Sequence, residues 1–457
     1  MSDLLERARV AHDAGRLDEA EASYRRLLAL EVQHAGLFNN LGLVLVAQRR
    51  YADAVLQFEQ SLRQRPRYVN TLVALSNALI FSNRPDEAIV RCGEILAIDS
   101  QHVEARHNLA VALRTLNRHR EAIDELTALL AQDPADADAE FNLALCEFAI
   151  GDYASALRHH EARWRGSTPQ APLPLATIPL WQPGDDLGDA HAIVQAEQGL
   201  GDTLQFIRFV PELARRCASV HVQVQSALVD FVRRHLPGQH VGALGDEVPG
   251  EIPQRRIALM SLPLALQLTT ESDWASSGAY LHADPARAAA WRSRLPDAAL
   301  RVGVVWRGFP GHRNDHNRSL PLQTLAPWLG AMRASGTAVI ALQKDVNDAE
   351  REWLRRYANV HVLGDALADF DETAAVLDSL DHVVAVDTAV AHLAGGMARP
   401  ATILLPFSPD WRWQVDRDTT PIYPSVRLLR QRAIGDWNGA IHQLVVDAAR
   451  WAPAPPW

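Results

Sequence analysis

The sequence has little cysteine, no long apolar run and no excess of positive charge. Its three cysteines, Cys92, Cys146 and Cys217, are odd in number and far apart. This excludes a CxxC metal or redox site and favours free thiols in a reducing compartment. No stretch reaches the roughly 18 apolar residues of a membrane span, and the N-terminus lacks the apolar core of a signal peptide. We therefore expect a cytoplasmic protein without a membrane span.

The formal net charge of -10 gives no general attraction to nucleic acid, so we expect no nucleic-acid partner. A length of 457 residues suits about three domains of roughly 150 residues each. Composition changes sharply near residue 165: all twelve tryptophans lie at Trp164 or later, and 19 of the 25 glycines follow Gly166. Two different architectures are therefore expected, the first over residues 1–166.

A period of 34 residues runs through residues 1–166. It superimposes two sets of small residues without any insertion: Ala20, Ala54, Ala88, Ala122 and Ala156, then Ala8, Gly42, Ser76, Ala110 and Ala144. Tyr24 and Phe58 recur at an aromatic position. This pattern resembles the tetratricopeptide repeat and implies about five helical hairpins stacked into an α-helical solenoid. The groove of such a solenoid binds extended peptides, so a protein partner is expected there.

Asn40, Asn108 and Asn142 occupy one register of the repeat, just before its Leu-Gly or Leu-Ala pair. An asparagine amide both donates and accepts, so such a ladder can hold a peptide main chain whatever its sequence. The ladder is similar to that of the nucleocytoplasmic O-GlcNAc transferases. It is partial, because Glu6 and Ala74 stand in the other two registers. The alternative is that these asparagines only serve repeat packing.

Residues 167–185 are predicted to be a stiff linker, since five prolines lie between Pro169 and Pro183. Ile178 and Trp181 suggest that the linker packs along the domain that follows. Few contacts are expected to cross this boundary.

Residues 186–285 are predicted to form a first α/β domain. A strand over 191–196, a glycine turn and a helix over 203–216 follow in order, with further strands over 220–224 and 257–260 and a helix over 227–235. The turn GLGDTLQF resembles the G-x-G-D turn of heptosyltransferase-like glycosyltransferases, which implies Asp202 as the base and Gly201 beside the donor. Glu197 and Gln198, just before the turn, are candidate contacts of the acceptor or the sugar. The alternative for Asp202 is a helix N-cap.

Residues 286–457 are predicted to form a second α/β domain. The β-branched run at 383–386 indicates a buried strand, and Asp387 and Thr388 end it and open a helix of small residues that carries His392. Helix N-terminal amides beyond a strand's carboxyl end favour negative charge, so Thr388 and Ala389 are expected to hold a diphosphate, with Asp387 and His392 nearby. The alternative is an ordinary capped turn with a buried histidine.

A loop rich in cations follows the predicted strand 301–306 and suits a nucleotide diphosphate. Its cationic residues are Arg307, His312, Arg313, His316 and Arg318. In heptosyltransferases a cation just before the next helix meets the donor phosphates, and this likeness implies that role for Arg318. His312 is a candidate contact of the acceptor or the sugar.

Further elements complete the second domain. A strand over 338–342 leads to Gln343 and Lys344, expected at the donor, and helices are predicted over 348–357 and 372–380. A strand over 401–405 precedes Trp411 and Arg412, which face the sugar or acceptor or else pack between the domains. The last helix, 437–451, is expected to return to the first α/β domain, as it does in the family.

The plan of tetratricopeptide repeats followed by two Rossmann-like domains resembles GT-B glycosyltransferases, in particular bacterial enzymes that modify flagellin. The resemblance implies metal-independent, inverting transfer from a nucleotide sugar to a protein Ser/Thr hydroxyl, flagellin being one expected acceptor. No cofactor is expected beyond the donor substrate. Two alternatives stay open: a lipopolysaccharide or small-molecule heptosyltransferase-like enzyme, and a repeat scaffold with an inactive glycosyltransferase half.

Overall fold

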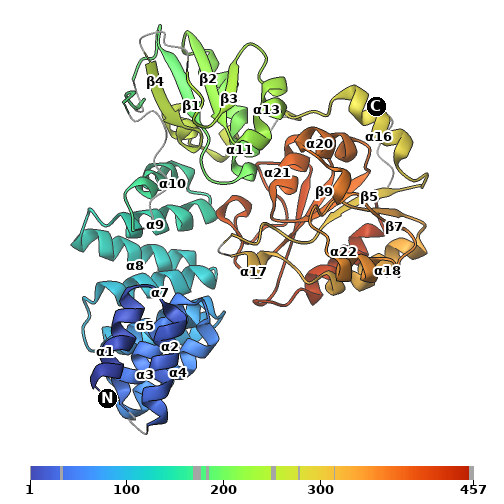
Figure 1. The fold of residues 1–457 in the computed structure, drawn as a ribbon. Helices are drawn as coiled ribbons and strands as arrows, with labels where there is room; N and C mark the ends of the chain where they lie inside the picture. The colour runs from blue at the N-terminus through green and yellow to red at the C-terminus, as the bar shows by residue number, and fades with distance from the viewer. Residues whose placement is uncertain are drawn as a thin grey trace. The chain divides into compact units, whose positions relative to one another are not determined.

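The computed structural model describes residues 2–30, 34–167, 177–181, 185–248, 254–275, 278–312 and 314–451. The chain forms two compact units, residues 1–146 and residues 147–457 (Figure 1). Most of the predicted linker, and Arg313 of the cationic loop, lie outside the described residues.

The N-terminal part consists of paired antiparallel helices, one pair for each 34-residue period. The helices are α1 Ser2–Asp13, α2 Leu17–Ala29, α3 Ala35–Ala47, α4 Tyr51–Gln64, α5 Val69–Phe81, α6 Pro85–Leu96, α7 Val103–Thr115, α8 His119–Gln132, α9 Ala137–Ala149 and α10 Tyr153–His159. The five predicted repeats are confirmed.

Small residues recur because the paired helices approach closely. Ala20, Ala54, Ala88 and Ala122 are fully buried. A Cβ atom at Gly42 would lie 2.4 Å from the Phe58 ring, so only glycine fits there without a shift of the ring. The periodic sequence therefore specifies the helix pairing directly.

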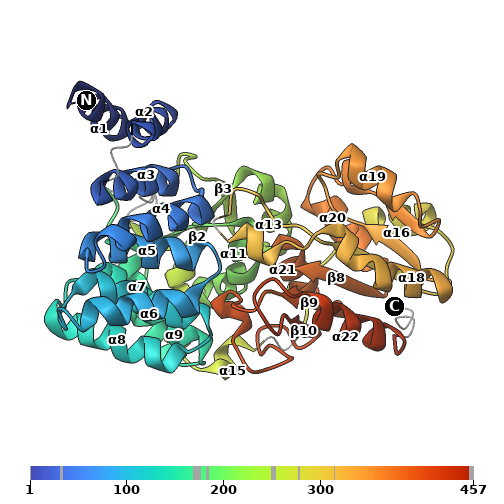
Figure 2. The same cartoon turned by 90° about the horizontal axis from the view of Figure 1, so that it is seen from below.

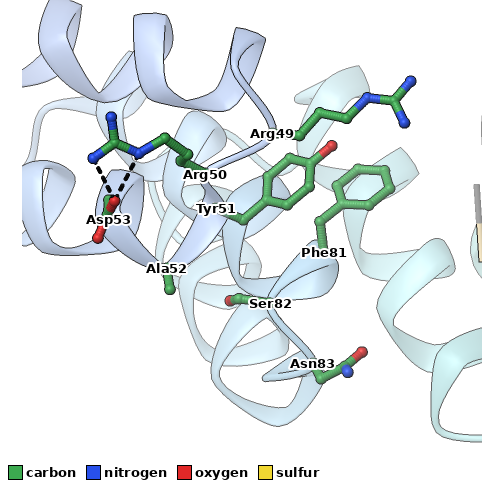
Figure 3. Close-up of a pocket in the computed structure, with 8 residues that line it drawn as sticks. All are labelled: Arg49, Arg50, Tyr51, Ala52, Asp53, Phe81, Ser82 and Asn83. Atoms are coloured by element: carbon green, nitrogen blue, oxygen red, sulfur yellow. Dashed lines mark hydrogen bonds and ion pairs between the residues drawn. The ribbon is translucent and has the colours of Figure 1, made fainter. Parts of the chain in front are cut away.

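The turn inside each repeat also repeats at the period of 34. One residue at each turn has a positive φ: Gly15, Arg49, Asn83, Asn117 and Gly151. This left-handed backbone favours glycine or asparagine, so Arg49 is the exception in the series. Beside Arg49, the Tyr51 and Phe81 rings stack at 4.9 Å and line a pocket of about 360 Å³ (Figure 3).

The second unit contains two parallel sheets. The first has the order β3-β2-β1-β4, built from β1 His191–Gln195, β2 Ser219–Val224, β3 His240–Ala243 and β4 Gln254–Ala258. The second has the order β10-β9-β8-β5-β6-β7, built from β5 Arg301–Val305, β6 Ala338–Ala341, β7 Val360–Val362, β8 His382–Val386, β9 Ala401–Leu405 and β10 Val426–Arg430. Strand order reverses between β1 and β4 and between β5 and β8, where such sheets bind ligands. The arrangement is consistent with a GT-B-like fold.

Helices connect the strands of both sheets. They are α11 Leu200–Phe206, α12 Val210–Ala214, α13 Val229–His235, α14 Leu262–Ala265, α15 Glu271–Trp274, α16 Pro285–Arg294, α17 Asp315–Arg318, α18 Ala326–Ala334, α19 Asp348–Leu354, α20 Phe370–Asp378, α21 Ala389–Gly396 and α22 Asn438–Ala448. Helix α11 of the first sheet lies against α21 of the second (Figures 1 and 2). Among the described residues, no helix is long and apolar enough to cross a membrane.

Several element boundaries differ from the sequence predictions. The short strands β3, β7 and β10 were not predicted, because three to five residues carry little periodic signal. The helix predicted from Thr203 begins at Leu200 and is interrupted by a 3-10 turn before Val210. Helix α22 packs on α18 and β10 of the second sheet, so its expected return to the first α/β domain is wrong.

The end of the last repeat is built into the α/β unit. The Arg163 guanidinium donates to both carboxylate oxygens of Glu197, each at 2.9 Å, and to Ser261 at 2.7 Å. Glu197 follows β1 and Ser261 follows β4, so Arg163 fills the switch point of the first sheet. The expectation of few contacts across residue 166 is therefore wrong. The buried guanidinium of Arg163 requires an opposite charge nearby, and that charge is Glu197 of the α/β unit.

We predict that Arg163→Ala lowers the free energy of unfolding of the second unit by about 3 to 5 kcal/mol, since it leaves the buried Glu197 without its ion-pair partner. Urea unfolding followed by tryptophan fluorescence measures this unit, because all twelve tryptophans lie at residue 164 or later. The control is Arg158→Ala in α10, an exposed arginine expected to change stability by about 0.5 kcal/mol or less. Equal stability of the two variants would contradict the prediction.

Candidate functional site

The carboxyl end of β8 opens into the N-terminus of α21. Thr388 is the N-cap residue in extended conformation, and its hydroxyl makes no cap hydrogen bond. The Thr388 Oγ1 atom is buried and has no partner among the described residues. A free hydroxyl beside the first amides of a helix is suited to bind the oxygens of an anion.

His392, one turn into α21, is a buried neutral side chain. Its Nδ1 atom lies 3.0 Å from the Tyr423 hydroxyl, and its Nε2 atom lies 4.0 Å from the Asp387 carboxylate. Burial lowers the pKa of His392 to about 3, and the nearby Arg412 adds to this effect. The ring also stacks on Trp413 at 5.3 Å. His392 therefore supports the N-terminal turn of α21 and carries no charge near neutral pH.

Arg318 lies across the same strand end. Its guanidinium donates to the Asp387 carbonyl at 3.1 Å and to Asp315 at 3.2 Å, and its side chain is 13% exposed. The structure thus brings Arg318 beside Asp387 and the helix N-terminus, as the sequence predicts. One part of the guanidinium stays accessible to solvent and to a ligand.

The glycine turn of the first sheet meets this end of the second sheet. A Cβ atom at Gly201 would lie 2.7 Å from the His392 ring and 3.5 Å from the Ala389 Cα atom. Glycine is therefore required for α11 and α21 to pack this closely. Asp202 is the next residue of α11 after this contact.

Asp202 has partners at both carboxylate oxygens. Oδ2 accepts from the Gly199 amide at 2.7 Å, which closes a helix cap, and Oδ1 pairs with Arg412. Burial raises the pKa of Asp202 above its ordinary value, while the Arg412 guanidinium opposes this rise. The cap predicted as an alternative is therefore present, and the second carboxylate oxygen of Asp202 is held by Arg412.

Arg412 joins the two sheets through a single guanidinium. It donates to Asp202, to Gln205 at 3.0 Å and to Asp410 at 2.8 Å, and it lies 4.2 Å over the Trp411 ring. Its side chain is only 6% exposed. Arg412 is therefore a shared counter-ion for the carboxylates of Asp202 and Asp410.

Two neighbouring carboxylates differ in their protonation. Burial and the repulsion of Asp410 raise the pKa of Asp387 to about 6, although Arg318 and Arg412 act against this. Burial would also raise the pKa of Asp410, but the Arg412 guanidinium outweighs it and holds that pKa below its ordinary value. The Asp387 carboxyl therefore binds a proton more readily than the Asp410 carboxyl.

Four predicted contacts make other interactions. Glu197 is buried in its ion pair with Arg163, and Gln198 is exposed in a left-handed backbone conformation. Gln343 accepts from the amides of Trp306 and Arg307, so it fastens β6 to the end of β5. The exposed Lys344 donates to a backbone carbonyl, that of Ala368, at 3.4 Å.

His312 lies on the cationic loop, near enough to Asp202 and Asp410 for their charges to affect its pKa. Burial lowers its pKa, and the adjacent Arg318 acts in the same direction. The carboxylates of Asp410 and Asp202 oppose this shift.

The three asparagines of the repeat are partly engaged within the solenoid. Asn108 Nδ2 donates to the Ser76 hydroxyl at 2.9 Å and to the Val73 carbonyl. Asn142 Nδ2 donates to the Asp138 carbonyl at 2.9 Å, and Asn40 accepts from Asn39 at 3.3 Å. These bonds support repeat packing.

Three residues around Arg412 and His392 were not predicted from the sequence. Asp410 and Gln205 hold Arg412, and Tyr423 holds His392. Asp410 directly precedes the predicted Trp411-Arg412 pair, and its position as the cap of a short turn is the signal that points to it. Gln205 and Tyr423 carry no such signal, because their role depends on packing between distant segments.

The comparisons with known proteins support the repeat region. Residues 5–69 and 107–172 match one family model described as tetratricopeptide repeat, and residues 45–110 match another of the same description. Protein FlbA of Caulobacter vibrioides is 23% identical over 316 residues, a match covering 64% of this chain and 51% of that protein. The chain therefore spans about half the length of this curated relative.

Solved structures resemble a shorter part of the chain. YrrB, titled a TPR protein with an unusual peptide-binding site, is 23% identical over 35% of this chain and 82% of its own, with a TM-score of 0.31. A tetratricopeptide repeat protein from Parabacteroides merdae is 19% identical over 35% of this chain and 64% of its own, with a TM-score of 0.33. The protein thus carries tetratricopeptide repeats followed by two parallel α/β sheets and is a distant relative of FlbA.

We predict that Asp387→Asn stabilises the second unit by on the order of 2 kcal/mol at pH 7 and by much less at pH 4.5. The folded pKa of about 6 lies above the ordinary value, so the folded state loses stability as the pH rises from the ordinary pKa through the folded one. Asparagine mimics the neutral acid and removes this loss. Urea unfolding at both pH values tests the prediction, and a pH-independent difference would contradict it.

Proposed function

We propose that the protein is a glycosyltransferase that moves a sugar from a nucleotide sugar to a Ser or Thr hydroxyl of a protein. The observation that carries this proposal is the contact of two strand-to-helix turns, one from each parallel sheet. In it, Gly201 of the first sheet packs on His392 and Ala389 of α21. Asp202 is the next residue on the first turn, and Thr388, whose buried hydroxyl has no partner among the described residues, begins the second. One turn offers a base and the other an anion site, as group transfer from a nucleotide diphosphate requires.

The donor diphosphate would bind at the start of α21. The Thr388 hydroxyl, the first amides of the helix and Arg318 can each donate to phosphate oxygens, and neutral His392 adds no competing charge. The negative charge that develops on the leaving group is stabilised by the same groups.

The transfer would proceed as one displacement. The acceptor oxygen forms a bond to the anomeric carbon while the bond from that carbon to the phosphate oxygen breaks. The electron pair leaves with the nucleotide, and the hydroxyl proton goes to Asp202. A single displacement inverts the anomeric configuration.

The helical repeats support a protein as the acceptor. A small acceptor would leave a five-repeat solenoid without a role, whereas tetratricopeptide solenoids suit extended peptides. Flagellin is the acceptor class that the resemblance of the whole plan favours.

Arg318→Ala should weaken binding of the nucleotide by about 1.5 to 3 kcal/mol, the contribution of a charge-assisted hydrogen bond. Calorimetry with a panel of UDP-, GDP-, ADP-, dTDP- and CMP-sugars measures this. Arg355→Ala, a largely exposed arginine on the same domain, is the matched control and should bind as the wild type does. Unchanged affinity for every nucleotide that binds the wild type would remove Arg318 from the site.

Asp202→Asn should lower turnover by roughly 100-fold or more while donor affinity stays close to that of the wild type. Asparagine preserves the shape but cannot take the proton. Turnover is measured as nucleotide release together with the mass gain of candidate acceptor proteins. The control is Asp230→Asn, an exposed carboxylate of the same domain. Near wild-type turnover of Asp202→Asn would leave this residue as a helix cap only.

A binding scaffold with an inactive α/β half is the second candidate. This candidate is favoured by the hydrogen bonds of Asp202, since both of its carboxylate oxygens already accept from groups of the protein. A complete lack of nucleotide binding by the wild type, together with retained binding of the acceptor protein, would support it over the transferase.

A further inference from the structure

The segment Asp410–Gln414 contacts three parts of the second unit. Arg412 bonds to Asp202 and Gln205 of the first sheet's helix α11. Trp413 stacks on His392 of α21 in the second sheet. Trp411 and Gln414 contact the last repeat.

The contact with the last repeat is aromatic and closely packed. The Trp411 ring stacks on Phe148 of α9 with centroids 4.0 Å apart and planes at 22°. Gln414 donates to the Tyr153 hydroxyl of α10 at 3.1 Å. Phe148 is 1% exposed and Trp411 is 8% exposed, so water is largely excluded from the stack.

The geometry of Arg412 leaves it little freedom of its own. Its three guanidinium nitrogens each have a separate partner, namely Gln205, Asp410 and Asp202. The face of the guanidinium rests on Trp411, so the position of that ring sets the plane of the guanidinium. A shift of Trp411 would therefore move the donor that holds Asp202 Oδ1.

We propose that Arg412 is a positioning residue for Asp202 and that the last repeat, through the stack of Phe148 on Trp411, holds Arg412 in place. The inference rests on the proposed role of Asp202 as the base. It adds that the repeat region contributes to the chemical step as well as to acceptor binding.

The pH dependence of turnover reports on this arrangement. The charged groups that act most strongly on the pKa of Asp202 are Arg412 and Asp410, and the Asp202 carboxylate acts in turn on the pKa of His312 in the loop after β5. A base must be ionised, so the rate rises as the pH passes through the pKa of Asp202. Removing the Arg412 charge raises that pKa and moves the acidic limb of the profile to higher pH.

The test compares the pH of half-maximal turnover in the wild type, Arg412→Gln, Arg412→Lys and Phe148→Ala, with the nucleotide sugar that the wild type uses fastest. We expect Arg412→Gln to move the acidic limb up by about 1 to 3 pH units, the range for loss of an adjacent opposite charge. Arg412→Lys keeps the charge and should move it less. Phe148→Ala should move it in the same direction as Arg412→Gln, with little change in donor KM.

The matched control is Ile80→Ala. Ile80 lies 68 residues, or two periods, before Phe148 and is a buried residue of the same register, but it belongs to the first unit. It should leave the acidic limb unchanged. Near-ultraviolet circular dichroism confirms that each variant is folded, and Arg412→Lys and Phe148→Ala serve if Arg412→Gln does not fold.

The outcomes separate the inference from the proposed function. If the wild type turns over no nucleotide sugar, both the proposed function and the inference about Arg412 are wrong. An active wild type with the same acidic limb in the folded Arg412 variants ends the positioning role of Arg412 alone. A limb that moves in the Arg412 variants and stays fixed in Phe148→Ala, or moves equally in Ile80→Ala, ends the role of the last repeat.

Discussion

The contact between the two parallel sheets is centred on one buried guanidinium, which two carboxylates share. Asp202 and Asp410 come from different sheets, and both are paired by Arg412, whose side chain is 6% exposed. Without that cation, the two carboxylates would repel each other across the contact of the sheets. Removing one partner of a buried ion pair typically costs several kcal/mol. Arg412 therefore holds the two sheets together, beside the packing of α11 on α21.

The contact between the sheets also requires that the turns before α11 and α21 approach each other closely, and small residues allow this. Gly201 lies against the His392 ring and the Ala389 Cα atom, where no larger residue would fit without a shift, so α11 and α21 approach each other closely. This brings a carboxylate from one sheet to the helix N-terminus of the other. The electrostatic contrast is local, because helix-terminal amides favour an anion while Asp202 favours a proton donor.

Sequence patterns predicted the parts of the fold that local chemistry determines. The period of 34 identified the repeats, and the β-branched run before Asp387 and the glycines around Leu200 identified both strand-to-helix turns. They did not predict the partners of Glu197 and Gln343, which resemble ligand contacts in sequence and are bonded to the protein's own backbone and side chains. Asp410 and Gln205 were missed for the same reason, because only packing between distant segments brings them to Arg412.

The two switch points of the sheets are used differently. Between β1 and β4 the position is filled by Arg163, which pairs with Glu197 and bonds to Ser261. Beside the switch point between β5 and β8, the Thr388 hydroxyl has no partner within the described part of the chain. A filled position cannot accept a nucleotide, whereas a free hydroxyl at a helix N-terminus can. Under the proposed function, the second sheet would therefore bind the donor, whereas the first sheet uses its equivalent position to attach the repeat that precedes it.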